Sequence, residues 1–180
     1  NRVDAYLDAL ENEIDYTAAK FYHKHLNSIY IGGGTPTTLE PYQLDRLIRK
    51  IKCSFDLSDC LEFTVEAGRP DSITREKLEV LRKWGITRIS INPQTMQQRT
   101  LDLIGRRHSV EQTVESFKIA RELGFDDINM DLIMGLPEES LEDVRDTLEQ
   151  IMQLKPDNLT VHSLALKRAA RLNMFKEDYK

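Results

Sequence analysis

Hydrophobic positions along the chain switch repeatedly between the spacing of a helix and the spacing of a strand. Two helices are marked by their caps: Ser109 and Gln112 form a capping box for a helix that ends at Gly124, and Ser140 begins another. A third predicted helix ends at Gly85, a natural left-handed cap position. Apolar stripes at helical spacing predict helices that include residues 3–14, 44–51 and 78–84.

Strand-like runs lie between these helices. The segments 81–92 and 120–131 also share one pattern of helix end, glycine, strand and polar terminus, which is a weak internal repeat. Regular alternation of helices and strands predicts a parallel α/β sheet with crossover helices, and no linker divides the chain. We therefore expect one domain over residues 1–180. The strand-like runs are 29–31, 61–67, 86–94, 128–137 and 159–165.

Four of these strands have an apolar face and a polar face. Strands of a parallel sheet that helices cover on both sides are apolar on both faces, so the polar face must line something wet or polar. A barrel lumen that holds a polar ligand satisfies this pattern, and five strands are too few to close an eight-fold barrel. The sequence predicts an open or partial barrel. Its apolar faces would carry Leu61, Phe63 and Val65; Ile89 and Ile91; Ile128, Met130 and Leu132; and Leu159 and Val161.

Composition narrows the class of protein. The 180 residues are 40% hydrophobic and 31% charged, which is enough for one globular core. A net charge of −5 without a basic run argues against a nucleic-acid partner, and no apolar stretch is long enough to span a membrane. Cys53 and Cys60 fit a reducing compartment, and their spacing does not indicate a metal site. We expect a cytoplasmic protein with no metal ligands in this chain.

The strand at 29–31 runs into the sequence GGGTPT, residues 32–37. Three glycines at a strand end suggest that something approaches the backbone closely. The motif is neither a P-loop nor a dinucleotide fingerprint, because the lysine and the glycine spacing of those motifs are missing. A phosphate, an amino-acid-like ligand and a plain loop all remain compatible with the residues alone.

Polar residues occupy equivalent ends of successive strands. Glu66, Gln94 and Asp131 share the carboxyl ends of their strands with the glycines, and barrel sites lie at these ends. Such carboxylates and amides can bind hydroxyl or ammonium groups. Arg106 in the loop IGRRH suits a carboxylate, although a solvated arginine is equally compatible. His162 is either a ligand contact or a packed lumen histidine.

Together these motifs resemble the radical S-adenosylmethionine superfamily, and they are most similar to its oxygen-independent coproporphyrinogen III oxidase family. The resemblance rests on the order of five motifs along nearly the whole chain. It implies an α/β partial (βα)6 TIM-like barrel, of which this chain supplies roughly strands 2–6 with their helices. The motifs are GGGTPT, Glu66 with the following Pro70, RISINPQTM, IGRRH and DLIMGLP.

The resemblance also implies two cofactors, S-adenosylmethionine and a 4Fe–4S cluster. It implies that the glycine motif holds the methionine amino end of S-adenosylmethionine. The cluster of the family is held by a C-x3-C-x2-C loop, which this chain lacks. We therefore expect a central piece of a longer protein, without the cysteine loop and the C-terminal substrate domain, that is inactive alone. The cofactor-binding positions implied by the resemblance are Gly33, Gly34, Thr35, Glu66, Gln94, Arg106, Asp131 and Ala165.

For the whole protein, the resemblance implies oxidative decarboxylation of coproporphyrinogen III propionates in haem biosynthesis, with a 5′-deoxyadenosyl radical as the hydrogen abstractor. Lys167, Arg168 and Arg171 are candidate contacts for the propionates of this porphyrinogen substrate. The family also includes haem-binding chaperones without oxidase activity, which is the alternative function. An ordinary metabolic barrel with an acid–base pair is disfavoured, because neither a phosphate loop nor a histidine–carboxylate pair is evident.

Overall fold

The computed structural model describes residues 2–21 and 25–165. Each of the first four strands is followed by at least one α-helix, as the hydrophobic pattern predicts. The strands are β1 (Ser28–Ile31), β2 (Glu62–Glu66), β3 (Arg88–Gln94), β4 (Ile128–Met134) and β5 (Asn158–Ser163). The α-helices are α1 (Arg2–Lys20), α2 (Pro41–Ser54), α3 (Arg75–Lys83), α4 (Gln98–Leu103), α5 (Val110–Glu122) and α6 (Leu141–Leu154), and two 3-10 turns are η1 (Pro36–Thr38) and η2 (Pro70–Ser72).

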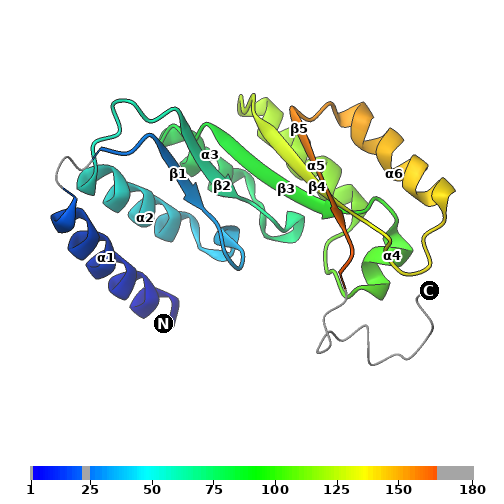
Figure 1. Ribbon diagram of the computed structural model, residues 1–180, viewed down its shortest axis with the longest axis horizontal. Helices are drawn as coiled ribbons and strands as arrows, with labels where there is room; N and C mark the ends of the chain where they lie inside the picture. The colour runs from blue at the N-terminus through cyan, green and yellow to red at the C-terminus, as the bar shows by residue number, and fades with distance from the viewer. Residues whose placement is uncertain (1, 22–24, 166–180) are drawn as a thin grey trace.

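The five strands form one parallel sheet in the order β1-β2-β3-β4-β5, so neighbours in the chain are neighbours in the sheet (Figure 1). β1 and β5 lie at opposite edges and do not pair with each other. The sheet is therefore open, and the prediction of a partial α/β barrel is confirmed. The carboxyl ends of all five strands lie along one rim of the sheet, because the strands are parallel.

Local sequence signals fix the helix ends. The capping box at Ser109 is present, with its side chain accepting from the backbone N–H of Gln112, and Ser140 caps α6 in the same way. Gly85 follows α3 with a φ of +73°, as expected of a left-handed cap. The sequence did not predict α4, because six residues are too few to show an amphipathic stripe.

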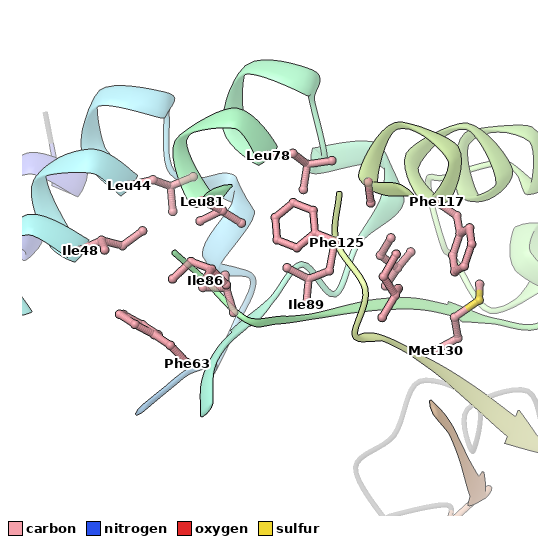
Figure 2. Packing of buried hydrophobic residues seen from close by; sticks show 14 of the residues in the cluster. Leu44, Ile48, Phe63, Leu78, Leu81, Ile86, Ile89, Phe117, Phe125 and Met130 are labelled. Carbon is pink, nitrogen blue, oxygen red and sulfur yellow. The ribbon is translucent and has the colours of Figure 1, made fainter. Parts of the chain in front are cut away.

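The hydrophobic core is a layer between the sheet and its helices. Phe63, Ile89 and Met130 of the strands are at most 3% exposed. Figure 2 shows them facing side chains of α2, α3 and α5. Those helix side chains are Leu44, Ile48, Leu78, Leu81 and Phe117.

Two expectations about the apolar faces are corrected. Leu61 precedes β2 and is 87% exposed, so it does not join Phe63 in the core. Leu159 and Val161 of the edge strand β5 are 37% and 50% exposed and are not part of the buried cluster. The apolar layer is thus less buried at the β5 edge of the sheet.

Candidate functional site

A polar cavity of about 210 Å³ lies at the carboxyl rim of the sheet. It brings together residues of β2, β3, β4 and β5 with residues of three loops, which follow β1, β2 and α4. Six of its lining residues are among the sequence-predicted positions: Gly34, Thr35, Glu66, Gln94, Arg106 and Asp131. His162 also lines it, and Gly68, Arg69 and Asn92 line it without having been predicted.

The three glycines of the loop after β1 differ in what would prevent a side chain at each position. A Cβ at Gly32 would lie 2.2 Å from the ring of Tyr30, which folds back over this residue. Gly33 has a φ of +109°, a conformation that side chains rarely allow. Gly34 has neither constraint, since nothing lies within 4 Å of its hypothetical Cβ. The open space at Gly34 is room for a ligand next to the backbone.

A buried lysine anchors the loop that carries these glycines. Lys77 of α3 is 8% exposed, and its ammonium donates to the carbonyl oxygens of Thr37 at 2.6 Å and Ser72 at 3.1 Å. The hydroxyls of Thr37 and Ser72 are also hydrogen-bonded to each other at 2.6 Å. These bonds join η1 to η2, so the backbone on two sides of the cavity is held by one cation.

Arg106 is the unsatisfied charge of the cavity. It is half-buried, and its guanidinium makes no hydrogen bond or ion pair with any residue in the described part of the chain. Burial, followed by repulsion from Arg69, lowers the pKa of Arg106. Arg69, by contrast, is paired with Asp71 at 3.2 Å. A half-buried guanidinium without a partner is suited to a carboxylate or another anionic group of a ligand.

The carboxylates of Glu66 and Asp131 both line the cavity. Asp131 accepts a hydrogen bond from the amide of Asn129 at 2.7 Å through Oδ1, and its Oδ2 lies 3.9 Å from Nε2 of His162. Glu66 lies beside Tyr30, and partial desolvation together with this carboxylate raises the pKa of the Tyr30 phenol. Both carboxylates can therefore accept hydrogen bonds from hydroxyl or ammonium groups in the cavity.

A chain of hydrogen bonds supports the cavity from below, on the polar face of the sheet. Asn129 donates to Ser90 at 3.0 Å, and Ser90 donates to Asn92 at 2.7 Å. Thr160 donates to the side-chain amide oxygen Oδ1 of Asn129 at 3.0 Å. A second polar cavity of about 270 Å³ adjoins this hydrogen-bond chain and shares Asp131 and His162 with the first cavity. The polar strand face thus lines polar space, as predicted.

A larger cavity, of about 710 Å³, is a different environment. It lies between α1 and β1 and is lined mainly by apolar side chains such as Leu10, Ile14 and Phe55. It meets the polar cavity only at Gly34 and Thr35. Its lining suits apolar groups, so the polar cavity is the better candidate for a charged ligand.

Several predicted positions fall outside this arrangement. Gly33 and Ala165 do not line the polar cavity, although both lie close in sequence to its rim. Lys167, Arg168 and Arg171 lie outside the described residues. Cys53 is exposed on α2, and Cys60 precedes the amino end of β2, at the rim opposite the cavity.

The described residues offer neither a metal-binding cluster nor a membrane-spanning helix. Across residues 2–21 and 25–165, no group of three or more His, Cys, Asp and Glu side chains is arranged to hold a metal ion. Within these ranges no helix combines the length and the apolar character that a membrane crossing requires.

The fold and the cavity define an open α/β barrel whose carboxyl rim can hold a small polar molecule with an anionic group. Residues 4–151 match the family model of the Radical SAM superfamily, and the chain belongs to this superfamily. The resemblance inferred from the motifs is therefore confirmed. Proteins of this superfamily use S-adenosylmethionine and a 4Fe–4S cluster, which supports a radical enzyme.

Two curated relatives are both similar to the chain but differ in their names. The chain is 44% identical over 182 residues to the oxygen-independent coproporphyrinogen-III oxidase-like protein HemZ of Bacillus subtilis (strain 168), covering 99% of this chain and 36% of the relative. It is 41% identical over 169 residues to the heme chaperone HemW of the same organism, covering 92% and 44%. The chain therefore spans less than half the length of these relatives.

A solved structure confirms the barrel-like fold. Coproporphyrinogen III oxidase (HemN) from Escherichia coli, a radical SAM enzyme, superimposes with a TM-score of 0.85 at 36% identity. The superposition covers 91% of this chain and 38% of that protein.

The described residues fit one of the two superfamily cofactors. An open Gly34, an unpartnered Arg106 and two carboxylates match the amino-acid and ribose groups of S-adenosylmethionine. They do not fit the cluster, because the two cysteines lie away from the cavity and no thiolate set is present in the described ranges.

Proposed function

We propose that the polar cavity binds S-adenosylmethionine. The loop at Gly34 and Thr35 would hold the ammonium of the methionine end, and Arg106 would pair with its carboxylate. Glu66 and Asp131 would accept hydrogen bonds from the ribose hydroxyls. The observation that carries this proposal is the unpartnered, half-buried guanidinium of Arg106 beside an open glycine backbone.

The remaining predicted positions complete the proposed site. Gln94 lines the cavity and would donate or accept through its amide. Gly33 and Ala165 would contribute through their backbone near the rim. Their assignment, like that of Lys167, Arg168 and Arg171 as propionate contacts, is supported by the motif resemblance and by sequence position.

We propose that the chain is the central part of a longer radical SAM protein of the cytoplasm. Its free cysteines, Cys53 and Cys60, are compatible with a reducing compartment. Residues outside the described ranges would hold the cluster and most of the substrate. The cofactor pair supplies the radical chemistry, while this chain binds and orients the nucleoside and amino-acid groups.

For the whole protein, we propose an oxidase-like activity on coproporphyrinogen III in haem biosynthesis. The similarity to HemZ and to HemN supports this activity. The alternative is a haem-binding chaperone, which is supported by the almost equal similarity to HemW. Because both kinds of relative share the matched segment, the cavity alone is expected to serve either function.

The binding proposal is tested by calorimetric titration of the intact, cluster-loaded protein with S-adenosylmethionine under anaerobic conditions. We expect saturable binding that excess free methionine does not reverse, because the ribose contacts add to the amino-acid contacts. Absence of saturable binding up to millimolar ligand would contradict the proposal.

The two activities are separated by one anaerobic assay with S-adenosylmethionine, a reductant and coproporphyrinogen III. Protoporphyrinogen together with 5′-deoxyadenosine is expected for the oxidase. Cofactor cleavage or binding without a porphyrin product, combined with stoichiometric haem binding, would support the chaperone and reject the oxidase.

A further inference from the structure

The carboxyl end of β3 departs from regular strand geometry. Ile91 pairs with Met130 and Gln94 pairs with Leu132, so β3 has one residue more than β4 between these pairs. Gln94 has a φ of +71°, which is unfavourable for a residue with a side chain. Such a conformation persists only if surrounding contacts impose it. The amide of Gln94 reaches the cavity from this irregular backbone.

His108 makes the contact that holds this backbone from outside the strand. Its side chain is 1% exposed, and its Nε2 lies 3.2 Å from the carbonyl oxygen of Pro93, the residue before Gln94. Because a carbonyl only accepts, Nε2 must carry the proton. The neutral imidazole is favoured, since burial is the main cause that lowers the pKa of His108.

The same histidine belongs to the loop that carries Arg106. Only one residue separates Arg106 from His108, and this loop connects α4 to α5. The hydrogen bond to Pro93 therefore joins the Arg106 loop to the end of β3. It links two cavity residues that come from different segments, while His108 itself does not line the cavity.

The cost of this arrangement argues against a role in packing alone. Nδ1 of His108 is buried and has no hydrogen-bond partner among the described residues. An unsatisfied buried nitrogen destabilises a protein, and an apolar side chain of similar size would avoid the penalty. What an apolar side chain would lose is the Nε2–H donor to Pro93.

We propose that His108 is a positioning residue that sets Gln94 for ligand binding through its hydrogen bond to the Pro93 carbonyl. This inference rests on the proposed S-adenosylmethionine site. According to this proposal, His108 contributes to the affinity for S-adenosylmethionine although it lies outside the cavity. The contribution depends on the presence of the Gln94 side chain.

Two amide substitutions test the bond itself. The amide nitrogen of glutamine can take the place of Nε2, whereas that of asparagine corresponds to Nδ1 and falls short of Pro93. In the intact, cluster-loaded protein, we expect H108N to raise the Kd for S-adenosylmethionine about tenfold, and H108Q to keep it within about threefold. H25Q is the matched control, because His25 pairs with Asp56 and Asp59 at the opposite rim of the sheet.

A double-mutant cycle tests whether His108 acts through Gln94. H108N is expected to raise the Kd by less than about threefold when Gln94 is already alanine, because the positioned amide is gone. An equal, tenfold loss in both backgrounds would overturn the proposal, as would an unchanged Kd in H108N. If H108N does not fold, H108Q decides: it must fold and bind within about threefold, and a tenfold loss overturns the proposal. Wild-type protein that binds no S-adenosylmethionine would instead reject the proposed function.

Discussion

The two faces of the sheet are stabilised by different interactions, although the same strands form both. Toward the helices, Ile89 and Met130 are fully buried among apolar neighbours, and no directional bond is needed. On the other face, Ser90 and Asn129 are held by hydrogen bonds to specific partners. Successive side chains of a strand point to opposite faces of the sheet. The apolar residues of these strands therefore stabilise the fold on one face, and the polar residues line the ligand cavities on the other.

The polar cavity also carries features that reduce stability. Arg106 is partly desolvated without a partner, and Gln94 has an unfavourable backbone conformation. The hydrophobic layer shows no such feature among the core residues named above. Strain and unpaired charge at one rim are compatible with a stable fold because the apolar layer offsets their cost.

The largest effect is expected from truncation in the hydrophobic layer. I89A should lower the free energy of unfolding by about 2–5 kcal/mol, because Ile89 is fully buried and the cavity left behind cannot close. S90A, one residue away on the polar face, should lower it less, by about 1–2 kcal/mol, through the lost bonds to Asn92 and Asn129. Urea unfolding of the 180-residue chain measures both. Equal losses would mean that the two faces do not differ as described.

A substitution at the cavity should separate affinity from stability. R106M is expected to weaken S-adenosylmethionine binding about 10- to 100-fold, because the carboxylate loses a charged partner. Its melting temperature should be unchanged or higher, since burial disfavours the charged guanidinium in the folded protein. R107M is the matched control, because Arg107 is exposed and does not line the cavity. A large drop in melting temperature for R106M would show that Arg106 has a stabilising partner.

Most of the fold could be predicted because it depends on local patterns. The five strands and their helices follow from spacing, caps and glycines. Leu61 was assigned to the wrong environment, since hydrophobicity alone does not show that β2 begins one residue later at an uncovered rim. The short helix α4 gave no signal because it has less than two turns of pattern.

The site was only partly predictable, because some residues that line the cavity are brought there by contacts that the sequence does not show. Glu66 could be found from its place at the end of β2, and Asp131 from the polar face of its strand, although β4 continues to Met134. Arg69 and Asn92 line the cavity but look like ordinary loop and strand residues in the sequence. The left-handed conformation of Gln94 could not be foreseen either, because glutamine has no preference for it.

Two neighbouring glycines provide a smaller, matched comparison. G33A should destabilise the fold by about 1–2 kcal/mol, because alanine is strained at a φ of +109°. G34A should leave the free energy of unfolding within about 0.5 kcal/mol, since its Cβ meets no atom. The added methyl group should nevertheless weaken S-adenosylmethionine binding about fivefold by occupying ligand space. Unfolding curves and titrations of both variants check this; unchanged binding in G34A would place the ligand elsewhere.

The smallest effect expected is a pH dependence of the free energy of unfolding that comes from His108. Burial, followed by the charge of Arg106, lowers the pKa of His108 in the folded protein, while its Pro93 bond and Asp71 act in the opposite direction and Arg69 adds to the lowering. The unfolded chain then binds more protons than the folded one, so stability should fall as the pH decreases from about 7 to about 5. H108Q removes this group but keeps the donor, and its stability should fall less over the same range. Parallel urea unfolding at several pH values measures the difference. If stability depended equally on pH in the wild type and in H108Q, His108 would have the same pKa in the folded and unfolded protein. That result would contradict a buried, neutral imidazole at this position.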